Sequence, residues 1–132
     1  MDTTRTLSML FKPAGDMPGA WVAHVLDFHS YTYGLSLPQA IQSALEVAAV
    51  VVQEDFTIGR DPTDRRAPEA DWQELRGIIQ HGELASDFDQ AAHAAAVVLI
   101  VPCTFPMADG GPPRQPKPRM AAPLVQSFQA AA

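Results

Sequence analysis

The sequence predicts an α+β fold with the element order β-β-β-α-α-β, in which a fourth strand returns to join three antiparallel strands. Three observations lead to this prediction. Short apolar runs with strand-like alternation open the chain, and an apolar pattern of helical period follows them. A helical insertion comes next, and then a continuous β-branched run near residue 100. Strands grouped ahead of helices are typical of α+β proteins.

The three predicted strands cover residues 7–11, 21–28 and 30–33. Turn-forming residues separate the first two. Both faces of the second strand are largely apolar, so we expect it to be central or buried on both sides. The third strand is short and places Tyr31 and Tyr33 on one side.

A long helix follows Gly34. Ser36 and Gln39 form a predicted capping box, in which the Ser36 hydroxyl accepts from the Gln39 amide and the Gln39 side chain reaches back. Pro38 stands in the first turn, where its missing donor costs little. Gly59 ends the helix. The apolar positions recur at helical spacing: Leu37, Ile41, Leu45, Ala48, Val52 and Phe56.

Three valines, Val47, Val50 and Val51, widen the apolar face of this helix. They are explained either by deep burial within the monomer or by a self-association surface. Beyond a charged loop, the pattern predicts a second helix over 69–81 and a brief one over 86–92. The last strand is predicted over 96–101.

The chain has 132 residues, which suits one domain, and a formal net charge of −6. We expect a folded domain over 4–105 and a flexible Pro-rich tail over 106–132, which holds six prolines. The net negative charge of the whole chain disfavours nucleic-acid binding and suits a basic protein partner, although the same charge also serves plain solubility. The chain has a single cysteine, and we find neither an apolar run long enough for a bilayer nor a leader pattern. We therefore predict a cytoplasmic protein.

Catalytic chemistry finds little support in the residue pattern. Asp27 ends a strand, but a nuclease needs several carboxylates converging on metal ions. We therefore expect Asp27 to cap a turn by accepting backbone donors. The histidines show no metal-ligand spacing, and we predict neither a metal nor another cofactor.

Two groups of residues are candidates for contacting a partner. His29 with Tyr31 and Tyr33 marks a strand end that forms either a contact surface or ordinary turn packing. Leu124 and Phe128 are four apart and would share a helix face, either as a short docking peptide or packed on their own domain.

Four segments, in their order and spacing, resemble the HicB antitoxin family over about the first 105 residues. The segment 21–28 is similar to the family's second strand, and 61–62 stands where its Pro-containing loop begins. Residues 97–102 resemble its last strand. In the helix start 34–40, Gly34 opens the match, Ser36 takes the capping Thr position and Ala40 the helix Ala position. The family's Pro-Gly-Cys turn is replaced here by His29-Ser30-Tyr31.

The resemblance implies a truncated ribonuclease H-like fold and an antitoxin that covers the active site of a small basic RNA-cleaving toxin. It also implies a homodimer or higher oligomer. Family members usually add a DNA-binding module, for which the segment 106–132 is a poor candidate. The leading hypothesis is thus a non-catalytic, HicB-like antitoxin. The alternative is a stand-alone oligomeric adaptor that recruits a client through its Pro-rich tail, and a ribonuclease H-like enzyme is the weakest of the three.

Overall fold

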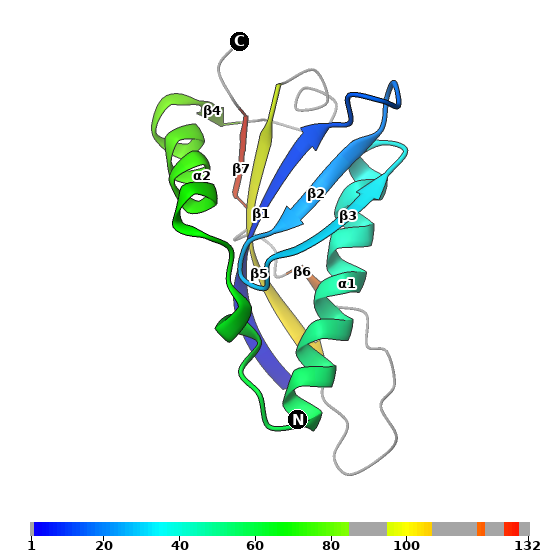
Figure 1. The fold of residues 1–132 in the computed structure, drawn as a ribbon, viewed down its shortest axis with the longest axis vertical. Helices are drawn as coiled ribbons and strands as arrows, with labels where there is room; N and C mark the ends of the chain where they lie inside the picture. The colour runs from blue at the N-terminus through cyan, green and yellow to red at the C-terminus, as the bar shows by residue number, and fades with distance from the viewer. Residues whose placement is uncertain (1, 85–94, 107–118, 121–125, 130–132) are drawn as a thin grey trace.

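The computed structural model describes residues 2–84, 95–106, 119–120 and 126–129. Its central feature is an antiparallel sheet with a long helix on one face and a shorter helix on the other (Figure 1). The four main strands run in the order β3-β2-β1-β5, which confirms the predicted α+β fold with a returning strand. Neither of the described α-helices has the length and apolarity needed to cross a membrane.

The strands pair in continuous registers. β1 (Asp2–Pro13) lies between β2 (Trp21–Val25) and β5 (Val97–Pro106), and β3 (Ser30–Gly34) borders β2 at the edge of the sheet. Met9 pairs with Val25 on one side and with Leu99 on the other.

The second strand is shorter than the predicted 21–28, because residues 26–29 form a turn. Asp27 ties this turn to β1, because its carboxylate accepts a 2.6 Å hydrogen bond from the Ser8 amide. His29 closes the turn in the left-handed region, with φ of 53°. The prediction of both faces buried holds for most of β2, but Val22 is exposed.

The first long helix, α1 (Leu37–Thr57), begins and ends as the sequence predicts. The Ser36 hydroxyl accepts from the Gln39 amide at 3.3 Å, and the Gln39 side chain accepts from the Leu35 amide, one residue before the cap. At the other end Gly59 adopts φ of 75°. The amides of Gly59 and Arg60 bond to Phe56 and Asp55 respectively, which is the Schellman pattern.

Helix α1 packs across one face of the sheet and forms the larger core. Its buried residues meet alternate side chains of β1, β2 and β5, including Phe11, Ala23 and Leu99. Alternation along each strand sends the intervening residues to the opposite face. There α2 (Glu69–His81) covers a smaller cluster that contains Leu10, Val98 and Leu75. The bounds of α2 agree with the prediction.

Short strands extend the sheet beyond the predicted four. β7 (Gln126–Gln129) pairs with residues 97–100 of β5 and with β4 (Glu83–Leu84), while β6 (Arg119–Met120) pairs with residues 103–104. These pieces of the Pro-rich segment therefore return to the domain. Proline cannot donate to a ladder, and the segment's prolines all lie outside β6 and β7. The short 3-10 helix η1 (Pro62–Arg65) links α1 to α2, and the predicted helix over 86–92 lies outside the described residues.

Candidate functional site

The sheet face beneath α2 is only partly covered. Helix α2 packs over β1 and β5, whereas Val22 of β2 and the tyrosines of β3 stay exposed on the same face of the sheet. Tyr31 and Tyr33 are each 59% exposed there, and Val22 is 36% exposed. The register places Val22 opposite Tyr33 and His24 opposite Tyr31, so the two tyrosines and Val22 form one continuous surface. An uncovered aromatic patch on a sheet is typical of an interaction surface.

A groove of about 330 Å³ runs between this surface and α2. It is lined by three carboxylates: Asp16 from the turn after β1, and Asp71 and Glu74 from α2. Lys12 is the one lysine in the lining, and its Nζ lies 2.8 Å from Glu74. The groove therefore combines an apolar floor with an acidic rim. The other lining residues are Leu10, Pro13, Ala14, Gly15, Val22, His24 and Tyr31.

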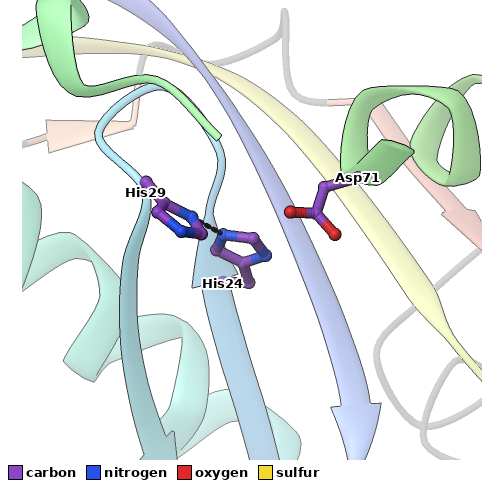
Figure 2. Close-up of side chains that lie close together, drawn as sticks. All are labelled: His24, His29 and Asp71. Atoms are coloured by element: carbon purple, nitrogen blue, oxygen red, sulfur yellow. Dashed lines mark hydrogen bonds between the residues drawn. The ribbon is translucent and has the colours of Figure 1, made fainter. Parts of the chain in front are cut away.

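Two histidines meet where β2 turns into β3. Nε2 of His24 lies 3.0 Å from Nδ1 of His29 at hydrogen-bond distance, and the His24 ring stacks on Tyr31 with centroids 4.0 Å apart. Figure 2 shows the Asp71 carboxylate facing the His24 ring from α2. Burial lowers the pKa of His24, while the nearby Asp71 charge opposes this shift. His24 is thus a buried side chain with a hydrogen-bond partner.

The structure brings together two residues that the sequence indicated as contact candidates and two that it did not indicate. His29 and Tyr31 were candidates for a contact surface, and they lie together with His24. Asp71 gave no signal of its own, because an acid in the first turn of a helix is explained by the helix dipole. Spacing along the chain also gave no hint of a ligand set. The fold nevertheless brings one donor atom each of His24, His29 and Asp71 within 4.8 Å of one another.

The remaining proposed contact residues lie elsewhere. Val47 and Val50 are half-buried on α1, and Val51 is half-buried and packs against the larger core. Leu124 is outside the described residues. Phe128 lies in β7, so its backbone is a strand and not the helical turn that would bring it beside Leu124.

Asp27 occupies the turn-capping position that the sequence predicts. Besides accepting from Ser8, its carboxyl group is half-buried, and this burial raises its pKa. Asp55, a buried acid near the end of α1, pairs with Arg65. Within the described part of the chain, His24, His29 and Asp71 form the cluster of potential metal-ligating side chains, and Asp27 lies outside it.

Comparison of the chain with protein families, curated proteins and solved structures finds no match in any of the three.

Proposed function

We propose that this chain is a non-catalytic protein-binding module whose contact surface is the open face of β2 and β3. The observation that carries the proposal is the pair of exposed tyrosines, Tyr31 and Tyr33, beside a groove with an acidic rim. Tyrosine is enriched at the energetic centres of protein interfaces, because it buries a large apolar ring and keeps a polar tip.

The charge around this surface indicates the chemistry of the partner. The chain carries a formal net charge of −6, and Asp16, Asp71 and Glu74 gather at the groove. Opposite charge steers encounter and selects against acidic partners, whereas the apolar contacts supply the affinity. A small basic protein fits these requirements best.

The edge of the sheet offers a second means of contact. β3 is the outermost strand on its side of the described sheet, so its outer backbone groups have no strand neighbour there. Such an edge accepts an extended segment of a partner through main-chain hydrogen bonds. The tyrosines on its face would then hold the same partner from the side.

The resemblance to HicB antitoxins suggests what this partner does. We propose a small basic RNA-cleaving toxin, whose active site the acidic face of this module covers in the cytoplasm. The mechanism is occlusion, so inhibition requires binding and no chemical step on this chain. The same resemblance also suggests that the chain forms a homodimer or a higher oligomer in this complex.

The test is co-expression of the chain with the protein encoded beside it, followed by size-exclusion chromatography with light scattering. The proposal predicts a stable complex with a small basic neighbour and loss of that neighbour's ribonuclease activity. A basic neighbour that stays separate and fully active in the presence of excess chain would overturn it.

A further inference from the structure

We propose that His24, His29 and Asp71 form a binding site for one zinc ion at the end of the groove. Two imidazole nitrogens and one carboxylate oxygen are a donor set that zinc favours. The three residues come from β2, from the turn that follows it and from α2, and one donor atom of each lies within 4.8 Å of the others.

The separation of the two nitrogens matches a shared ion closely. His24 Nε2 and His29 Nδ1 are 3.0 Å apart. With Zn–N bonds of about 2.0–2.1 Å, two nitrogens on one tetrahedral zinc stand roughly 3.3–3.4 Å apart. A shift of a few tenths of an ångström and a turn of the rings therefore replaces the hydrogen bond by two bonds to the ion. The Asp71 oxygen lies within 4.8 Å of the other two donor atoms, so it would have to approach them by up to about 1.5 Å to share the ion.

The backbone at His29 supports a specific role for this residue. Its φ of 53° is in the left-handed region, which a residue other than glycine adopts at a cost. Glycine or asparagine would relieve that cost in an ordinary turn. Histidine in this conformation holds its ring against His24, whose own ring is buried and stacks on Tyr31.

Three protein ligands leave one position of a tetrahedral zinc open. His24 and Asp71 both line the groove, so the open position would be reached from the groove. Water or a donor atom of a bound partner would complete the coordination. The zinc site thus adds an open coordination position to the binding face, which its apolar and charged residues do not supply.

The test is a titration of the untagged full chain with Zn²⁺ by isothermal calorimetry, in competition with a chromophoric chelator. Two substitutions remove single ligands with little change in shape. His29→Asn keeps a residue type that tolerates the left-handed backbone, and Asp71→Asn preserves side-chain size. His81→Asn is the matched control, because His81 is exposed at the far end of α2 and outside the cluster.

The proposal predicts one zinc per chain, with affinity lowered roughly tenfold or more by each ligand substitution and unchanged by the control. Co²⁺ in place of zinc should give the visible absorption of a four-coordinate site, which the same two substitutions abolish. Absence of stoichiometric binding to the wild-type chain would overturn the proposal, as would binding that survives both substitutions. No partner is needed here, so failure of this test and failure of the proposed function are separate results.

Discussion

Gly34, the last residue of β3, lies directly against the backbone of Ala40 in the first turn of α1. A Cβ built on Gly34 would stand 2.3 Å from the Ala40 amide nitrogen, a distance that no real side chain tolerates. The neighbouring atoms are backbone and cannot move aside cheaply. The sheet and the helix are therefore joined here by a contact that requires glycine.

Gly34→Ala should accordingly destabilise the fold. Separating the strand from the helix start disturbs the larger core, and we expect a loss of about 2 kcal/mol or more in the free energy of unfolding. Urea denaturation followed by circular dichroism measures the change. Gly77→Ala is the control, since nothing lies within 4 Å of its added Cβ and alanine favours a helix, so this variant should gain up to about 1 kcal/mol. Equal stability of Gly34→Ala and wild type would contradict the close approach.

The hydrogen bond from the Ser8 amide to Asp27 predicts different results for two substitutions. Asp27→Ala leaves a part-buried backbone donor without its acceptor and should cost about 1–3 kcal/mol. Asp27→Asn retains an oxygen at the same position, so most of the stability should remain. Thermal unfolding of the two variants at neutral pH makes the comparison. Equal losses would show that the negative charge of Asp27, and not its capping bond, is what matters.

Cys103 should react very slowly with thiol reagents in the folded protein. Its side chain is fully buried, and burial together with the Asp27 charge raises the thiol pKa to about 12. Only the thiolate is nucleophilic, so at about pH 8 almost none of the folded protein is reactive. Modification by a disulfide reagent, followed by absorbance, should accelerate sharply in denaturant. Rapid modification of the native chain at this pH would place Cys103 at the surface instead of in the core.

Local interactions explain what the sequence predicted well. The capping box at Ser36, the stop at Gly59 and the bounds of α2 each depend on residues within a few positions of one another. The apolar pattern of helical period then predicted the long helix that α1 forms. The placement of Tyr31 and Tyr33 on one side of their strand was also predicted, because side chains alternate along a strand. The structure shows that both are exposed there.

Long-range packing explains the features that the sequence did not predict. Asp71 comes close to His24 only because α2 lies over the same face of the sheet, and no periodicity along the chain encodes that position. The early end of β2 depends on Asp27 bonding to a residue in another strand. β7 escaped notice because a four-residue strand within a Pro-rich segment has no pattern of its own until β5 pairs with it.

The central claim is that Tyr31 and Tyr33 bind a basic protein partner. Alanine substitution of both removes exposed rings that lie outside the two hydrophobic clusters, together with the stacking of Tyr31 on His24. The fold should therefore lose little of its unfolding temperature, while affinity for the partner falls tenfold to a hundredfold. Ile58→Ala is the control, since Ile58 is 66% exposed beyond the far end of α1.

Calorimetric titration of the basic neighbour with the wild-type chain, the Tyr31→Ala/Tyr33→Ala variant and the Ile58→Ala variant is therefore the most direct measurement. The account predicts tight binding by the wild type and by Ile58→Ala, and a large loss of affinity for the double variant alone. Undiminished binding by a folded double variant would contradict it.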